Sequence, residues 1–112
     1  SPPLIAMGDA PDKPDPKGFI LLAKKLSREK FGPSNIPIAY VGDTIADIKT
    51  VINARKQIPS QKFISIGVSP PHLHLKSRLK ERSCYESKLR EAGADIILNS
   101  VNDLKNIDFE LL

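Results

Sequence analysis

The sequence predicts an α/β fold built on a parallel β-sheet, and three observations support this prediction. Short runs of apolar residues alternate with segments whose apolar residues recur at helical spacing. Within each run the apolar residues are consecutive, which is typical of parallel strands covered on both faces. Strands that alternate with helices imply right-handed crossovers between neighbouring parallel strands.

The first predicted helix begins at Asp15 and extends to Leu26. Asp15 can cap its amino end and Pro16 suits its first turn. The apolar residues of this helix recur at helical spacing, at positions 19, 22, 23 and 26. Residues 32–35 then predict a break, and residues 36–41 predict the first strand.

The rest of the chain continues the alternation. A helix follows residue 44 at once, because its apolar residues share one face: Ile45, Ile48, Val51 and Ile52. The later elements are a strand over 62–68, a loop from Pro70, a charged helix from about 75 to 92 that Gly93 ends, a strand over 94–98 and a short helix over 101–104.

Length and composition limit the class of protein. The chain has 112 residues, of which 40% are apolar and 27% charged, so residues 1–112 fit one small domain. No run approaches the roughly 18 apolar residues of a membrane-spanning helix, and the first residues lack the features of a signal peptide. The single cysteine, Cys84, cannot form an internal disulfide, so we expect the cytoplasm or another reducing compartment.

The turn after the first predicted strand is the first place to expect chemistry, because ligands of parallel sheets bind beyond the carboxyl ends of the strands. Asp43 lies in this turn and Asp47 four residues later, so both carboxylates approach one point. Such a pair suits Mg²⁺. In the alternative interpretation, Asp43 only caps the helix and Asp47 is stabilised by the helix dipole.

A lysine in a proline-rich turn is the second candidate. Lys13 begins the sequence KPDP at residues 13–16, in which Pro14 and Pro16 fix the backbone around Asp15. An ammonium pairs well with phosphate oxygens, so a lysine beside a metal site indicates phosphoryl chemistry. The alternative is a solvated surface lysine.

Together, the sequences at 13–16, 38–48 and 92–98 resemble the KPxP, GDxxxD and later elements of a haloacid dehalogenase (HAD)-superfamily phosphatase, in the C-terminal half of its core domain. The resemblance covers nearly the whole chain and implies a three-layer, Rossmann-like parallel sheet that is incomplete here. It implies that Lys13 steadies the catalytic nucleophile and binds the substrate phosphate. It also implies that the catalytic acids Asp43 and Asp47 hold Mg²⁺, with Asp43 as the inner-sphere ligand.

Three features of that family are absent: the nucleophilic aspartate of a DxDGT-like motif, the phosphate-binding Ser or Thr, and the cap domain. Asp9 and Asp12 do not replace the nucleophile, because the residues around them lack its motif. We therefore expect a fragment that needs its missing N-terminal half as a partner, since the strand at 36–41 would otherwise expose an edge. Residues 70–87 look like an insertion relative to shorter members.

The function expected from this resemblance is part of a Mg²⁺-dependent phosphomonoester hydrolase for a small phosphorylated metabolite. An aspartyl-phosphate would form on an aspartate outside this chain, so the chain alone is expected to be inactive. Two alternatives stay open: a non-catalytic phosphate- or nucleotide-binding module, and a protein-interaction domain on the same scaffold. A P-type ion pump is disfavoured, because those pumps carry GDGxND where this chain has GDTIAD.

The remaining features indicate no other site. The formal charge is +4, with much of the excess between Lys76 and Arg90, but a mixed-charge helix with few aromatic residues favours a solvated face over nucleic-acid binding. We expect neither a nucleic-acid nor a membrane partner. His72 and His74 lack a third zinc ligand, Cys84 lacks an activating base, and the expected core phenylalanines are Phe19, Phe31 and Phe63.

Overall fold

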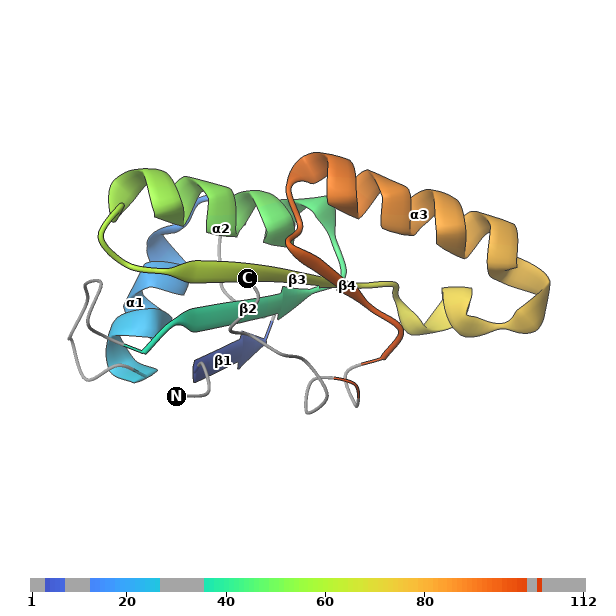
Figure 1. Cartoon of the computed structure of the whole chain (residues 1–112), viewed down its shortest axis with the longest axis horizontal. Helices are drawn as coiled ribbons and strands as arrows, with labels where there is room; N and C mark the ends of the chain where they lie inside the picture. Colours follow the sequence, from blue (N-terminus) through green and yellow to red (C-terminus); the bar gives the residue numbers. More distant parts are fainter. Residues whose placement is uncertain (1–3, 8–12, 27–35, 101–102, 104–112) are drawn as a thin grey trace.

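The computed structural model describes residues 4–7, 13–26, 36–100 and 103. In this part of the chain four parallel strands form one sheet in the order β1-β2-β3-β4, which confirms the predicted α/β class (Figure 1). The elements are β1 (Leu4–Met7), α1 (Lys17–Leu26), β2 (Ile38–Gly42), α2 (Ile45–Gln57), β3 (Phe63–Val68), the 3₁₀ turns η1 (Pro71–His74) and η2 (Lys76–Arg78), α3 (Leu79–Ala92) and β4 (Ile96–Leu98).

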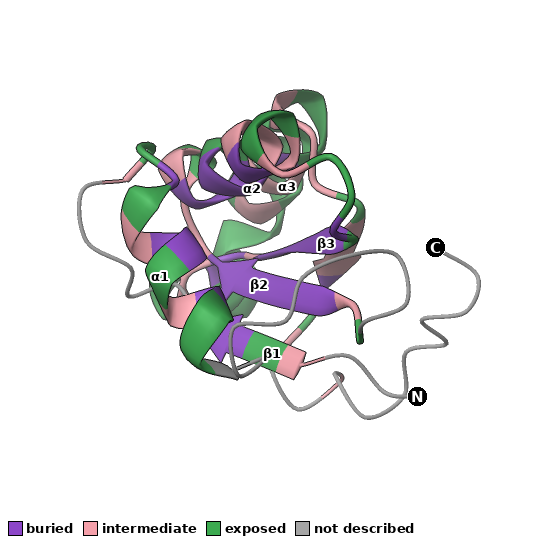
Figure 2. Ribbon diagram, turned by 90° about the vertical axis from the view of Figure 1, so that its left-hand side faces the viewer, coloured by how far each residue is buried: buried purple, intermediate pink, exposed green. Residues whose placement is uncertain are grey.

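The helices gather on one face of the sheet. Strand order follows chain order, and successive right-handed crossovers then carry every connecting helix to the same side. Contacts agree, because α1 and α2 share one apolar cluster with residues of β1, β2 and β3, and α3 packs beside α2 (Figure 2). A helical layer on the second face is not among the residues that the structure describes, so the three-layer arrangement stays a prediction.

Aromatic side chains form the centre of the core under α1 and α2. The ring of Phe19 lies 4.6 Å from that of Tyr40 and 5.3 Å from that of Phe63, measured between centroids. All three residues are buried, which confirms Phe19 and Phe63 as core residues. Phe31 lies outside the described residues.

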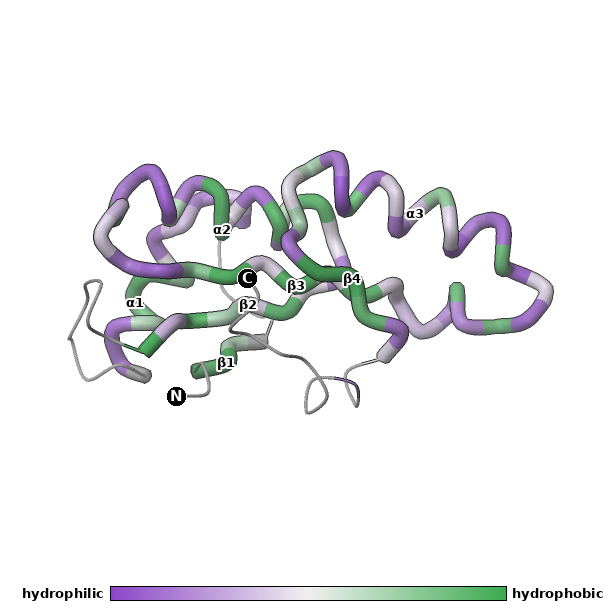
Figure 3. The backbone as a smooth tube through the Cα atoms, viewed as in Figure 1, coloured by the Kyte–Doolittle hydropathy of each residue, from purple (hydrophilic) through white to green (hydrophobic). Residues whose placement is uncertain are grey.

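The other face of the sheet is apolar as well. Its cluster consists of buried residues from β2, β3 and β4: Ala39, Val41, Ile64, Ile66 and Leu98. Every residue of β2 is buried, as expected of a strand covered on both faces. The hydropathy of the chain follows the same division, with hydrophobic strands and a largely hydrophilic α3 (Figure 3).

The strand β1 was not predicted. It pairs in parallel with β2 from Leu4 opposite Ile38 to Met7 opposite Val41. This short run contains one β-branched residue, Ile5, so local propensity is weak and the pairing itself fixes the strand. Because β1 covers one side of β2, the expectation that residues 36–41 form an edge strand in this chain is wrong.

The later boundaries agree with the prediction except at the start of α3. Leu75 is extended, with φ −70° and ψ 141°, so two 3₁₀ turns precede a helix that begins at Leu79 instead of residue 75. Gly93 ends this helix with a left-handed φ of 118°, as predicted. The break predicted at 32–35 and, apart from Asp103, the helix predicted at 101–104 lie outside the described residues. None of the helices described is long and apolar enough to cross a membrane.

Replacing Gly93 with alanine is expected to destabilise the fold by about 1–2 kcal/mol, because an L-residue is strained in the left-handed region. An added Cβ would also lie 2.9 Å from Cδ1 of Ile52. Urea denaturation followed by circular dichroism measures this loss, with Ser87→Ala on an exposed part of α3 as the control. Equal midpoints for the two variants would contradict the role given to Gly93.

Candidate functional site

The candidate site lies where β2 ends and α2 begins. Thr44 caps α2: its Oγ1 accepts a hydrogen bond from the Asp47 backbone N–H at 3.1 Å. The Thr44 backbone N–H and hydroxyl in turn donate to Asp47 Oδ2 at 3.1 and 2.8 Å. This reciprocal capping box means that Thr44, and not Asp43, is the cap of the helix.

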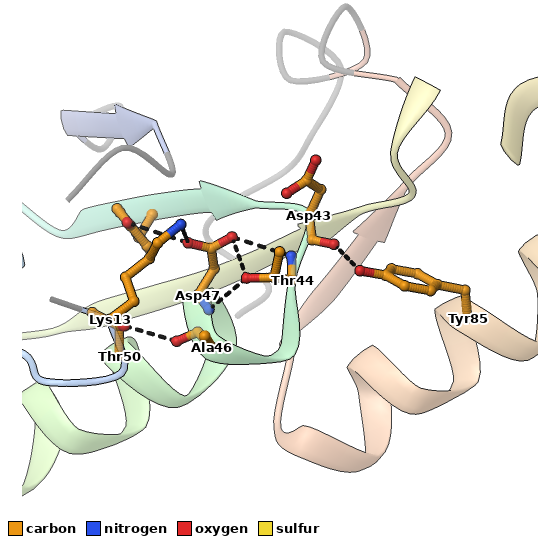
Figure 4. A network of polar contacts seen from close by, with 8 residues as sticks. Lys13, Asp43, Thr44, Ala46, Asp47, Thr50 and Tyr85 are labelled. Atoms are coloured by element: carbon orange, nitrogen blue, oxygen red, sulfur yellow. Dashed lines mark hydrogen bonds and ion pairs between the residues drawn. The ribbon is translucent and has the colours of Figure 1, made fainter. Parts of the chain in front are cut away.

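The other oxygen of Asp47 pairs with the predicted lysine. Lys13 Nζ lies 2.8 Å from Asp47 Oδ1, and the Tyr40 hydroxyl donates to the same oxygen at 3.4 Å (Figure 4). The Asp47 side chain is only 1% exposed and that of Lys13 is 26% exposed. A buried carboxylate is stable only when it is paired and hydrogen-bonded, and these contacts meet that need.

The turn that carries Lys13 is held by two further hydrogen bonds. Asn53 of α2 donates from Nδ2 to the carbonyl of Pro14 at 3.0 Å. The Asp15 carboxylate accepts from the Lys17 backbone N–H at 2.9 Å, which confirms its predicted place at the start of α1. The peptide bond between Lys13 and Pro14 is cis. Helix α2 thus supplies both the partner of Lys13 and an anchor for its turn.

Asp43 stands apart from this group. Its side chain is half-buried and makes no hydrogen bond or ion pair with any described residue. It points away from the contacts between Lys13, Thr44 and Asp47 (Figure 4). The structure therefore brings Lys13 and Asp47 into contact, whereas the Asp43 carboxylate makes no hydrogen bond or ion pair with either of them and extends in another direction (Figure 4).

Gly42 allows the close approach of α2 to the end of β2. A Cβ atom at this position would lie 2.3 Å from Cβ and 2.4 Å from Cγ of Asp47, far inside van der Waals contact. The glycine of the GDxxxD sequence is therefore a steric requirement of the Asp47 position.

Tyr85 is a neighbour of the site that sequence reasoning missed. From α3, its hydroxyl donates a short hydrogen bond to the backbone carbonyl of Asp43 (Figure 4). Burial raises the pKa of Tyr85 above 10.0, and the negative charges of Asp43 and Asp47 raise it further. The phenol therefore remains a protonated donor at neutral pH. The only signal in the sequence is an aromatic residue within a charged helix.

The described acids fit Mg²⁺ only in part. Among the described residues no group of three or more His, Cys, Asp or Glu side chains is placed to hold a metal ion. Magnesium, however, often takes one or two carboxylates and completes its shell with water and substrate phosphate. Asp43 has the open carboxylate for a direct contact, whereas the oxygens of Asp47 already accept four polar contacts. These contacts occupy the acceptor positions of a carboxylate, so in this arrangement Asp47 offers none to a metal ion or to a metal-bound water.

The histidines and the cysteine add no ligands to this site. Nε2 of His74 lies 2.8 Å from the carbonyl oxygen of Ser69, which can only accept, so this nitrogen is the donor. Cys84 is exposed on α3.

Comparison of the chain with known protein families, with curated proteins and with solved structures found no match. The function therefore has to be argued from the geometry of the site and from the motifs that form it.

Asp47→Asn is expected to destabilise the protein by about 2 kcal/mol, because it removes the charge that pairs with Lys13 and one acceptor of the capping box. Asp43→Asn is the matched control and is expected to change stability by less than about 0.5 kcal/mol, since its carboxylate has no partner among the described residues. Urea denaturation of both variants measures the difference. A loss of the same size in both would show that Asp47 has no special structural role.

Gly42→Ala is expected to destabilise the protein by about 3 kcal/mol, because the added methyl group overlaps Asp47 and forces the strand end and α2 apart. Gly67→Ala is the control, since its Cβ would lie 3.0 Å from the flexible tip of Ile97 and meets milder crowding. Thermal denaturation compares the two. If Gly42→Ala unfolds at the wild-type temperature, Asp47 is not held as described.

Proposed function

We propose that this chain forms part of a Mg²⁺-dependent phosphomonoester hydrolase of the HAD superfamily that acts on a small phosphorylated metabolite. One observation carries the proposal: the 2.8 Å contact between Lys13 Nζ and Asp47 Oδ1 at the carboxyl end of β2. Two motifs far apart in the sequence, each of which resembles an element of such enzymes, meet at the edge of the sheet where ligands bind.

Lys13 is suited to stabilise negative charge on a transferring phosphoryl group. The Asp47 carboxylate fixes the position of its ammonium, and Asn53 holds the turn from which it extends. The Lys13 side chain is 26% exposed, so it is not sealed inside the core. Asp47 is in this view a positioning residue for the lysine.

Asp43 is the residue that would hold Mg²⁺ directly, whereas Asp47 would position Lys13. When bound, the ion would shield the charge of the phosphoryl oxygens. The half-buried carboxylate of Asp43 has no competing partner among the described residues, which supports this role.

The nucleophile belongs to the part of the proposal that rests on resemblance alone. An aspartate outside this chain would attack phosphorus, displace the alcohol of the ester and form an aspartyl-phosphate. Water would then hydrolyse this intermediate and release inorganic phosphate. The chain alone would therefore show no turnover.

A non-catalytic phosphate-binding module is the second candidate. The saturated carboxylate of Asp47 favours it, because the capping box and the Lys13 pair explain this residue without any catalysis. Such a module would bind phosphate at Lys13 but would not release it from an ester, even in a longer protein that contains the nucleophile's motif.

Asp43→Asn in a longer protein that contains the nucleophile is expected to lower Mg²⁺-dependent phosphate release by about 100-fold or more, because it weakens the binding of the ion that stabilises the transition state. Phosphate released from p-nitrophenyl phosphate, measured over a series of Mg²⁺ concentrations, tests this. Glu91→Gln, on an exposed part of α3, is the matched control. Full activity of Asp43→Asn with an unchanged Mg²⁺ dependence would refute the proposal. Phosphate binding without any hydrolysis in the parent protein would favour the second candidate.

A further inference from the structure

The positive charge of the chain is concentrated on and just before α3. Six basic and two acidic residues lie between Lys76 and Arg90, so this segment has the same formal charge, +4, as the whole chain. Basic and acidic residues are balanced in the remainder. This segment is therefore a candidate for contact with an anion.

Both acids of the segment are already paired. Arg78 contacts Glu81 at 2.6 Å, and Arg82 contacts Glu86 at 3.1 Å. The exposed Lys80 and Lys88 make no ion pair with any residue that the structure describes. Lys80 and Lys88 are thus unpaired among the described residues, and Glu91, which follows the segment on α3, is the third acid of this helix.

These two lysines border one groove. A surface groove of about 380 Å³ is lined by residues on one face of α3: Lys80, Glu81, Cys84, Tyr85 and Lys88. Residues at i, i+4 and i+8 share a helix face, so Lys80 and Lys88 flank Cys84 and Tyr85. The Glu81 carboxylate is neutralised by Arg78, which leaves the groove with a net positive charge.

The groove is joined to the candidate site through Tyr85. This residue lines the groove with its side chain, and its hydroxyl contacts the backbone of Asp43. Other contacts fix α3 at this edge of the sheet: Ser69 donates to Glu86 at 3.0 Å, and Arg82 donates to the Asn99 carbonyl at 3.2 Å. Tyr85 therefore joins the wall of the groove to the turn that carries Asp43.

We propose that this groove binds a second phosphate of the substrate, so that the metabolite is a bisphosphate. The inference rests on the proposed function, because it takes the other phosphate to lie at Lys13 and Asp43. The charges are complementary: the lining of the groove includes two lysines, and a phosphate carries close to two negative charges at neutral pH. The methylene stems of the lysines and the Tyr85 ring provide an apolar wall for the carbon skeleton between the two phosphates.

Isothermal titration calorimetry of this chain with fructose 1,6-bisphosphate and fructose 6-phosphate tests the proposal. The two probes share one sugar and differ by one phosphate. The bisphosphate is expected to bind about tenfold more tightly, as charge-assisted contacts to two lysines allow. The double variant K80Q/K88Q is expected to lose this preference. The control K49Q/K56Q, which removes two exposed lysines of α2, is expected to keep it.

Three results would overturn the proposal that the groove binds a second phosphate. They are equal affinities of the wild-type chain for the two sugars, no measurable binding of the bisphosphate, and a preference for the bisphosphate that survives in K80Q/K88Q. Circular dichroism shows whether each variant is folded. The proposed function is tested separately by turnover in the longer protein. A bisphosphate preference without turnover would refute the phosphatase and retain the groove, whereas turnover at equal rates on both sugars would refute the groove alone.

Discussion

The buried carboxylate of Asp47 is the constraint on which the rest of the site depends. A charge that is almost fully removed from water must be compensated, and the compensation comes from three parts of the chain. Lys13 supplies the opposite charge, Thr44 supplies the hydrogen bonds of the capping box, and Tyr40 of β2 supplies a hydroxyl group. The turn at residues 13–16, the end of β2 and the start of α2 are thereby fixed relative to one another.

Because Asp47 is occupied by these contacts, the two acids have different roles. Asp47 is occupied by its partners, so it orients Lys13 and shapes the helix start, while Asp43 keeps an open carboxylate at the carboxyl end of β2. A helix cap and a phosphate site are compatible here because they use different residues of one short turn. This division is what would let an arrangement typical of many helix starts also serve the phosphoryl chemistry that we propose.

Helix α3 connects this turn to the most basic surface of the chain. The Tyr85 hydroxyl binds the Asp43 carbonyl, and Arg78 and Arg82 pair with two of the three acids of α3, Glu81 and Glu86. Residues 70–87, which look like an insertion relative to shorter members of the family that the chain resembles, contribute all of the residues that line the groove except Lys88.

The sequence by itself determined the parallel α/β class, three of the four described strands, the helices and the Gly93 terminus. These follow from local signals: apolar runs, helical spacing, and the positions of proline and glycine. The proximity of Lys13 to the acidic turn was expected from the resemblance to HAD-superfamily phosphatases and not from local signals. The hydrogen bonds between Thr44 and Asp47 are also local, because Thr-x-x-Asp before an apolar run is a capping-box pattern. Only the tertiary structure decided the pairing of Leu4–Met7 with β2, the burial of Asp47 with its contact to Tyr40, and the contact of Tyr85 with Asp43. These depend on how residues from different elements pack in space, which local patterns do not encode.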